Sequence, residues 1–122
     1  MVHDIHWEPH GVYKKYLGHV TGEEFLQAVE RVNAHPDFES FRYVINDFTE
    51  CESVDIKAAL FDLCVAAALG AQRSNSRFAA AFVAADTAVL DSINAIADSA
   101  RAEMTVLVFQ TLDEARHWAD SL

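Results

Sequence analysis

The sequence predicts an α/β protein in which a mixed, mostly parallel sheet is flanked by about four helices. The first observation is that an apolar strand, a short polar segment and an apolar helix follow one another three times along the chain. In the clearest copy, the apolar run 43–48 precedes a polar loop, 49–53, and a helix begins at about Val54. The second observation is a helix-capping pattern at both Thr21 and Thr111. Connections of this kind carry the binding residues of many α/β domains.

The first two elements are strands joined as a hairpin. Residues 6–8 and 12–17 are rich in aromatic and aliphatic side chains, and Pro9, His10 and Gly11 separate them. Proline and glycine between two such runs indicate a tight turn. We expect one face of the hairpin to be buried, while Lys14 and Lys15 remain in solvent.

The first helix follows this hairpin. Thr21 and Glu24 have the spacing of a capping box, in which each side chain satisfies a backbone N–H at the start of a helix. Val20 and Phe25 occupy the two apolar positions that flank such a cap. Apolar side chains then repeat at helical spacing until Pro36 ends the run. These side chains are Phe25, Val29 and Val32.

The second helix follows the central strand. We expect Ser53 to cap it and Gly70 to lie near its end. Its apolar face is wide and rich in alanine, which allows close approach to a sheet or to another helix. A strand of mostly small residues, 78–84, comes next. The side chains expected on the apolar face are Ile56, Leu60, Leu63, Cys64 and Ala67.

A third helix is expected from about Thr87 to Ala97, and 104–109 is a continuous apolar strand. Thr111 and Glu114 form a second capping box at the start of the last helix. The order of elements is therefore ββ-αβ-αβ-αβ-α, a sheet with helices packed on it. The last helix should bury Ala115, Trp118, Ala119 and Leu122 on one face.

Length and composition restrict the class of protein. The 122 residues are expected to form one domain, 1–122, and an apolar content of 52% excludes a disordered chain. The net charge of -10 argues against nucleic-acid binding. The N-terminus lacks the pattern of a secretory signal, and the longest apolar stretch is too short to span a membrane. With only two cysteines, the sequence favours a cytoplasmic protein.

Asp47 ends the central strand, where α/β proteins often place binding residues. It can dock a lysine or arginine of a partner, or hold the following loop by accepting backbone N–H bonds, and we favour the second role. Hydroxyl groups in the loop could receive a phosphate, but three nearby carboxylates would repel it, so we favour a capping role for Ser53. The candidate partner-docking loop comprises Asp47, Thr49, Ser53, Asp55 and Lys57.

Six histidines raise the question of a metal site. His3, His6 and His10 lie close in sequence, but His3 and His6 would point to opposite faces of a strand. The chain has neither a Cys-x-x-Cys nor a His-Glu-x-x-His pattern. We therefore expect a surface position for these histidines, and neither a metal nor another cofactor.

The cysteines do not suggest a catalytic thiol. Cys51 stands between Glu50 and Glu52, whose charges disfavour a thiolate. Cys64 has helical spacing with Leu60 and is expected to pack in the core. An enzyme would also need a base, a nucleophile and an oxyanion site in one cleft, and no set of residues here has that pattern.

Small side chains in the second helix and in the strand 78–84 allow two interpretations. They could leave an apolar pocket beside Phe61, Phe78 and Phe82, large enough for an acyl chain. Alternatively, they permit close backbone packing without a void, which is the interpretation that we favour.

Three stretches carry a resemblance to a known family: G-H-V-T-G-E-E-F (18–25), V-I-N-D-F (44–48) and V-F-Q-T-L-D-E-A-R-H-W (108–118). With the order of elements, they resemble the STAS superfamily, named for sulfate transporters and anti-sigma-factor antagonists. Within it, the chain looks like the SpoIIAA-like branch, whose fold is also compared with the CRAL-TRIO lipid-binding domain. The resemblance covers essentially the whole chain and implies a STAS/SpoIIAA-like fold.

Anti-sigma antagonists of this fold are switched by phosphorylation of a serine at the start of the helix after the central strand. Where those proteins carry Asp-Ser-Ser-Gly, this chain has Asp55, Ile56, Lys57 and Ala58. The phosphorylated serine is therefore absent at the matching position, and the resemblance does not imply this switch.

The resemblance implies a bacterial-type, non-enzymatic binding or regulatory module that docks a protein partner through the loops after its central strands. The alternative is a carrier or sensor of a small apolar, lipid-like ligand, which could associate with membranes through an exposed apolar helix face. A homodimer is a further hypothesis, because uncovered apolar helix faces favour self-association.

Overall fold

A five-stranded sheet organises the computed structural model, which describes residues 3–122 apart from the side chains of residues 58, 59 and 61. The predicted order of strands and helices is confirmed, with one short 3-10 helix, η1, in addition. The elements are β1 (His3–Trp7), β2 (Gly11–Thr21), α1 (Gly22–Asn33), η1 (Phe38–Ser40), β3 (Tyr43–Asp55), α2 (Ala58–Ser74), β4 (Ala79–Val83), α3 (Thr87–Ala100), β5 (Val106–Phe109) and α4 (Leu112–Asp120).

The strands lie in the order β1-β2-β3-β4-β5. β1 runs antiparallel to β2, as expected for a hairpin, and β2, β3, β4 and β5 are mutually parallel. Each parallel connection passes through a helix, which is the usual way to return the chain to the same end of a sheet. The predicted mixed, mostly parallel sheet with four flanking helices is therefore confirmed.

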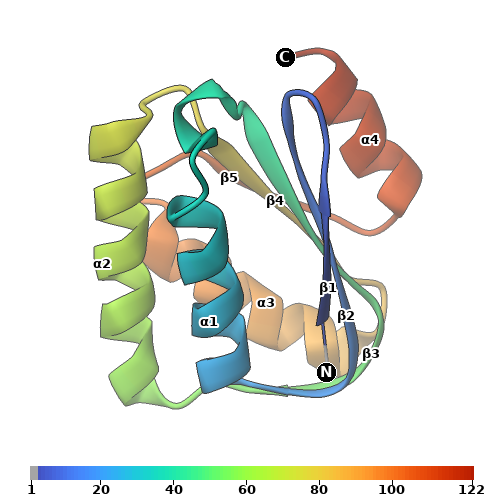
Figure 1. Ribbon diagram of the computed structural model, residues 1–122. Coiled ribbons are helices and arrows are strands. Elements are labelled where there is room, and N and C mark those ends of the chain that lie inside the picture. The colour runs from blue at the N-terminus through green and yellow to red at the C-terminus, as the bar shows by residue number, and fades with distance from the viewer. Residues whose placement is uncertain (1–2) are drawn as a thin grey trace.

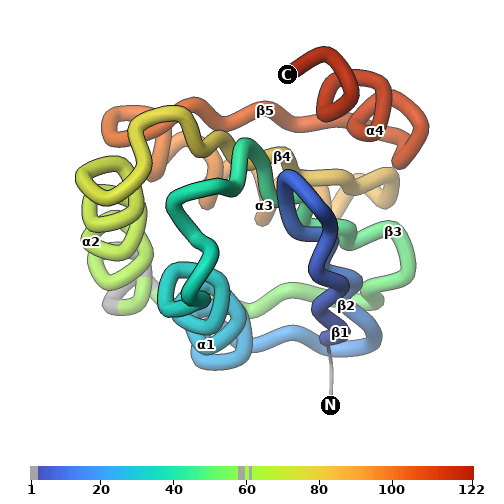
Figure 2. Tube along the Cα trace, turned by 45° about the horizontal axis from the view of Figure 1, so that its top comes forward, coloured from blue at the N-terminus to red at the C-terminus, as the bar shows by residue number. Residues whose placement is uncertain are grey.

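The helices are divided unequally between the two faces of the sheet (Figure 1). α1, α2 and α3 cover one face and bury the larger core, which includes Phe25, Phe48, Phe82 and Ile93. α4 lies on the other face, where Ala115 and Ala119 pack on the smaller core. Figure 2 shows the same division from a second direction, with α4 beyond the sheet from α1 and α2.

Two of the helix starts confirm predicted caps. The Glu24 N–H donates to Thr21 Oγ1 over 3.3 Å, and the Glu114 N–H donates to Thr111 Oγ1 over 3.2 Å. The Glu24 carboxylate does not complete the capping box, because it instead contacts His3 Nδ1 at 3.1 Å. That contact fastens the start of α1 to the first strand.

Glycine is required at two places in β2. A Cβ atom at Gly11 would lie 2.4 Å from the ring of Tyr43, so no larger residue fits beside that ring. Gly18 has a φ of 65°, a left-handed conformation that other residues rarely adopt. The register between β2 and β3 shifts between Lys15 and Leu17 and again between Gly18 and His19.

A polar clamp holds α4 to the first hairpin. The Arg116 guanidinium donates two hydrogen bonds to the Glu8 carboxylate, each 2.7 Å long, and the Tyr43 hydroxyl donates a third over 2.5 Å. These bonds, above all those from Arg116, hold the pKa of Glu8 below its ordinary value. The sequence did not predict this clamp, since Glu8 and Arg116 are 108 residues apart.

The structure corrects the predicted second helix. α2 begins at Ala58 instead of about Val54, and it continues past Gly70 to Ser74. Leu63 is 51% exposed and does not belong to the buried face, which Cys64, Ala68 and Ala71 form instead. Leu122, expected on the buried face of the last helix, is also exposed and follows the end of α4.

Among the described residues, no helix combines the length and apolar character needed to cross a membrane.

Candidate functional site

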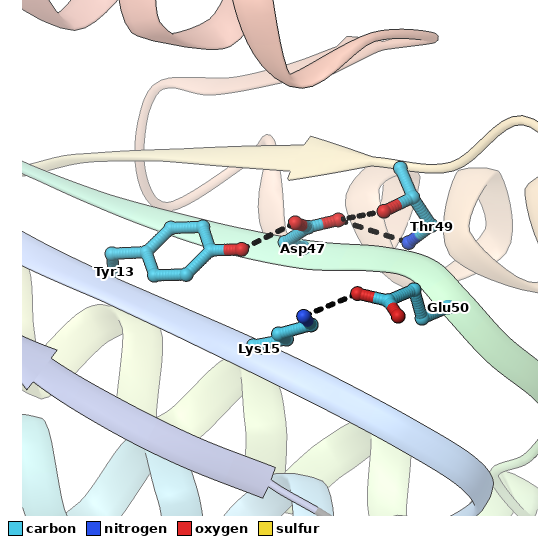
Figure 3. Close-up of polar contacts among 5 residues, drawn as sticks. All are labelled: Tyr13, Lys15, Asp47, Thr49 and Glu50. Atoms are coloured by element: carbon cyan, nitrogen blue, oxygen red, sulfur yellow. Dashed lines mark hydrogen bonds and ion pairs between the residues drawn. The ribbon is translucent and has the colours of Figure 1, made fainter.

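Asp47 lies at the end of the part of β3 that pairs with β4, and it is only 2% exposed. Its Oδ1 accepts bonds from the Thr49 N–H, over 2.9 Å, and the Thr49 hydroxyl, over 2.7 Å. Its Oδ2 accepts a 2.5 Å bond from the Tyr13 hydroxyl of β2 (Figure 3). Burial, and secondly this bond, raise the pKa of Tyr13. The carboxylate therefore already has three donors, and in this conformation it fixes the path of β3.

Of the other predicted docking residues, Thr49, Ser53 and Asp55 lie in a strand and not in a loop, and Lys57 follows that strand. β3 continues from Tyr43 to Asp55, so the loop predicted over 49–53 is wrong. The reason is nonlocal, because β2 extends beside it and pairs with it as far as Thr21. Ser53 is consequently not a helix cap. Its hydroxyl contacts His19 Nδ1, and Lys57 precedes α2 without a capping hydrogen bond from its side chain.

The second half of β3 has a free edge. β4 pairs with β3 only as far as Asp47, whereas β2 pairs with it to Asp55. In the described part of the chain, no strand pairs with the other edge of β3 after Asp47. Exposed polar side chains line this projecting segment, and Lys15 of β2 forms an ion pair with one of them, Glu50 (Figure 3). The exposed residues from here to the helix are Thr49, Glu50, Glu52, Asp55 and Lys57.

A buried lysine lies on the face of the sheet that α1, α2 and α3 cover. Lys14 is 1% exposed, and the expectation that it remains in solvent is wrong. Its Nζ lies 5.5 Å from the ring centroid of Phe25 and 5.7 Å from that of Tyr16. Burial lowers the pKa of Lys14 from 10.5 to about 7. Among the described residues, no hydrogen bond or ion pair joins this amine to another group.

Lys14 borders an apolar cavity of about 60 Å³ between the sheet and helices α1, α2 and α3. The cavity exists because α2 presents small side chains to it, where larger ones would fill the space. Phe78 and Phe82, two members of the predicted apolar pocket, line it, whereas the Phe61 side chain lies outside the described residues. The α2 residues that line it are Cys64, Ala67, Ala68 and Ala71.

Other polar atoms on this face of the sheet also lack partners in the described structure. Asn46 is the neighbour of Lys14 across the β2–β3 pair, and its Oδ1 is buried without a hydrogen bond. The Tyr16 hydroxyl and His3 Nε2 are also buried without a hydrogen bond. Unpaired buried polar atoms are rare in proteins. Of these three residues, Asn46 lines the cavity beside Lys14, where a bound molecule can supply the missing partner.

The two cysteines are buried and unbridged. Burial is the main cause that raises the pKa of both thiols, so both stay protonated near neutral pH. Cys51 belongs to β3 and not to a loop, and Cys64 belongs to the larger core, where the sequence placed it. His3, expected at the surface, is buried against Glu24 instead. In the described residues, no three His, Cys, Asp or Glu side chains are grouped as metal ligands would be.

Comparison with known proteins supports the fold. No family model matches the sequence, and no curated protein matches it either. Among solved structures, the chain is similar to the anti-sigma factor antagonist SpoIIAA in its unphosphorylated form. The TM-score is 0.61 at 10% sequence identity, and the alignment covers 98% of this chain and 99% of SpoIIAA. The predicted STAS/SpoIIAA-like fold is thus confirmed, and at this identity the similarity establishes the fold alone.

Proposed function

We propose that this protein is a non-enzymatic regulatory module that docks a protein partner along the projecting half of β3. The observation that carries the proposal is the free strand edge beyond Asp47, lined by exposed Thr49 and Asp55 and followed by Lys57. An unpaired strand edge can accept an additional strand from a partner through backbone hydrogen bonds. SpoIIAA, which has the same fold, is an antagonist of an anti-sigma factor, and so acts on another protein.

The partner should present a basic segment to this edge. Glu52 and Asp55 are exposed here, and the whole chain carries a net charge of -10, which favours encounter with a positively charged surface. In this proposal Asp47 positions the edge through Thr49, and Thr49, Ser53, Asp55 and Lys57 form the surface itself.

The test compares two double variants. T49R/D55R places two cations on the proposed surface, whereas T105R/D91R makes the same changes at exposed positions before β5 and in α3. Tagged wild-type protein and both variants are incubated with extract of the source cell, and captured proteins are quantified. A partner enriched by wild type and by T105R/D91R, but lost with T49R/D55R, supports the docking surface. Captured proteins that T49R/D55R retains contradict it.

The cavity favours a second candidate function, the binding of a small apolar ligand. Its lining is almost wholly apolar, and it includes Phe78 and Phe82. Native mass spectrometry of gently purified protein, with the denatured mass as reference, tests this function. Additional mass that disappears on denaturation supports a bound ligand, and identical masses after incubation with apolar compounds contradict it.

A further inference from the structure

We propose that the cavity binds an apolar monocarboxylic acid, with the ligand's carboxylate at Lys14 Nζ and its chain directed towards the seam between α1 and α2. The inference rests on the ligand-binding function proposed above and adds the chemical class of the ligand. It depends on the unpaired amine, on its neighbour Asn46, and on the position of the cavity wall.

The amine is the first observation. A lysine that is 1% exposed, among the rings of Tyr16 and Phe25, gains little from those rings compared with the hydration that it loses. A methionine would fill the same space at far smaller cost. A carboxylate of the ligand supplies the acceptor that Lys14 lacks among the described residues, and a charge-assisted hydrogen bond is among the strongest that a protein forms.

Asn46 is the second observation. Its Nδ2 donates to the carbonyl of Ala81 over 3.2 Å, which fixes the orientation of the amide. Its Oδ1 therefore remains an acceptor on the cavity side of the sheet, without a donor and beside Lys14. An ammonium has three N–H donors. One of them can donate to Asn46 Oδ1 while the others bind a carboxylate, so the two side chains together fit an anionic head group.

The size and position of the cavity indicate where the ligand's chain goes. A volume of about 60 Å³ is well below the roughly 150 Å³ cavity that admits benzene, so it holds only the first few carbons. An open groove lies on the outer side of α1 and α2, and Asn33, Ala67 and Ala71 line both the groove and the cavity. Small side chains and one 3.3 Å bond, from Asn33 Nδ2 to the carbonyl of Ala67, separate the two spaces. A longer chain can pass along this seam into the groove.

The same lining argues against a phosphate head group. Lys14, Asn46 and Asn33 are the polar side chains around the cavity, apart from the Cys64 thiol. A phosphate has three acceptor oxygens and close to two negative charges near neutral pH, which require more donors than these residues provide. A monocarboxylate carries one charge and matches one ammonium.

Among the described residues, few other titratable groups lie near the amine. They are the Cys64 thiol on α2, the Tyr16 hydroxyl on β2, and the His3–Glu24 pair, which joins β1 to α1 beside Tyr16. Burial raises the pKa of both Cys64 and Tyr16, so neither is an anion at neutral pH. A bound carboxylate would therefore raise the pKa of Lys14, and binding above about pH 7 should take up a proton from solvent.

Titration calorimetry with octanoate and 1-octanol tests the inference, because the two ligands differ only in the head group. Wild-type protein should bind octanoate at least about tenfold more tightly than 1-octanol. Lys14→Met should remove this preference while 1-octanol still binds. Lys15→Met is the matched control, since Lys15 is the adjacent residue on the other face, and it should retain the preference.

Proton uptake provides a readout on wild-type protein, independent of whether the variant folds. The enthalpy of octanoate binding near pH 8, measured in two buffers of different ionisation enthalpy, should show uptake of a proton. Equal affinity for acid and alcohol, absence of uptake, or a folded Lys14→Met that still prefers the acid overturns the inference. Equal, measurable binding of both compounds would support the ligand-binding function and contradict only the preference for a carboxylate. Failure of both compounds to bind would contradict both, and the T49R/D55R experiment on protein docking is independent of either result.

Discussion

Lys14 is a buried side chain that lowers the stability of the folded protein. Its neighbours Val12 and Tyr16 on the same face of β2 are fully buried, so the strand carries the amine into the core with them. Because the unfolded chain binds a proton at Lys14 up to a higher pH than the folded chain does, folding is penalised wherever the unfolded amine is charged. The amine is thus a site where a ligand or a substitution can change stability.

The stability of ligand-free protein should therefore depend on pH through Lys14. Its pKa is about 7 in the folded state, against an ordinary value of 10.5, so the penalty is complete below pH 7 and diminishes as the pH rises. Between about pH 7 and about pH 9, the free energy of unfolding should increase by about 2 kcal/mol. Urea denaturation at several pH values measures this increase. Lys14→Met should remove it and be more stable at pH 7, and a variant that keeps the same slope would show that another group is responsible.

Asn75 is a second buried polar residue, but its hydrogen bonds are satisfied. Its Nδ2 donates to the carbonyls of Phe38 and Phe41, over 2.9 and 2.6 Å, and its Oδ1 accepts from the Arg77 N–H. It thereby ties the end of α2 to the segment before β3.

Asn75→Ala should lower the free energy of unfolding by about 2–3 kcal/mol, because two buried carbonyls lose their donor. The control is Asn94→Ala at an exposed position of α3, which should change it by less than about 0.5 kcal/mol. Urea denaturation of both variants provides the measurement. Equal losses in the two would contradict the role of Asn75.

The two lysines of β2 show what a residue-level prediction missed. Lys14 and Lys15 are adjacent, so in a strand they must face opposite sides, and they cannot share one environment. Val12, Lys14 and Tyr16 alternate with Tyr13, Lys15 and Leu17, and this period of two was visible in the sequence. The preference of lysine for solvent outweighed that pattern. The partner Asn46 could not be foreseen, because its place beside Lys14 depends on strand register.

At the level of elements, α4 depends on few contacts for its position. Among the described residues, no other helix lies on this face of the sheet, where Ala115 and Ala119 provide a small buried surface (Figure 1). The Glu8–Arg116 clamp and the stacking of Arg116 over the Tyr13 ring, at 5.0 Å, add polar contacts. We therefore expect α4 to be the first helix to open.

Arg116→Ala should accelerate hydrogen exchange in α4 more than in the other helices, and it should destabilise the protein by about 1 kcal/mol. The lowered pKa of Glu8 means that its contribution is present above the ordinary carboxyl pKa and is lost as the pH falls through the folded value. The loss caused by the substitution should therefore shrink in acid. Exchange measured by mass spectrometry, with exposed Arg31→Ala as control, provides the test; uniform acceleration across all helices would contradict it.

The second half of β3 explains why helix and strand boundaries were harder to predict than their order. The segment T-E-C-E-S, 49–53, is polar and has the local composition of a loop. It is extended because β2, which comes much earlier in the chain, offers a paired backbone beside it. Local caps such as Thr21 and Thr111 were predictable, since each depends on residues only three positions apart.

For the whole molecule, the acidic composition opposes compactness. Nineteen acidic residues against nine basic ones give the net charge of -10, and few ion pairs in the described residues offset it. Mutual repulsion of this kind is screened by salt. The melting temperature should thus rise by a few degrees between about 20 mM and about 300 mM sodium chloride. Scanning calorimetry checks this, and a falling temperature would mean that the ion pairs outweigh the repulsion.

The order of the strands and of the four α-helices along the chain could be predicted from apolar periodicity, and the resemblance in three short stretches indicated the fold. The division of helices between the two faces did not follow, because it depends on which way each connection crosses the sheet. The cavity depends in the same way on how far α2 stands from β3 and β4. Such distances arise from packing between distant segments, and a single sequence does not specify them locally.

The clamp between Glu8 and Arg116 also sets an order of events during synthesis of the chain. Glu8 emerges early, but its partner is made 108 residues later. Until then α4 does not cover its face of the sheet, and Ile45, Ala81 and Val83 lack their contacts with Ala115 and Ala119. Closing so long a loop is slow compared with forming a hairpin or a helix. The contacts that α4 supplies to the smaller core therefore form after those of the hairpin and of α1, which depend on earlier residues.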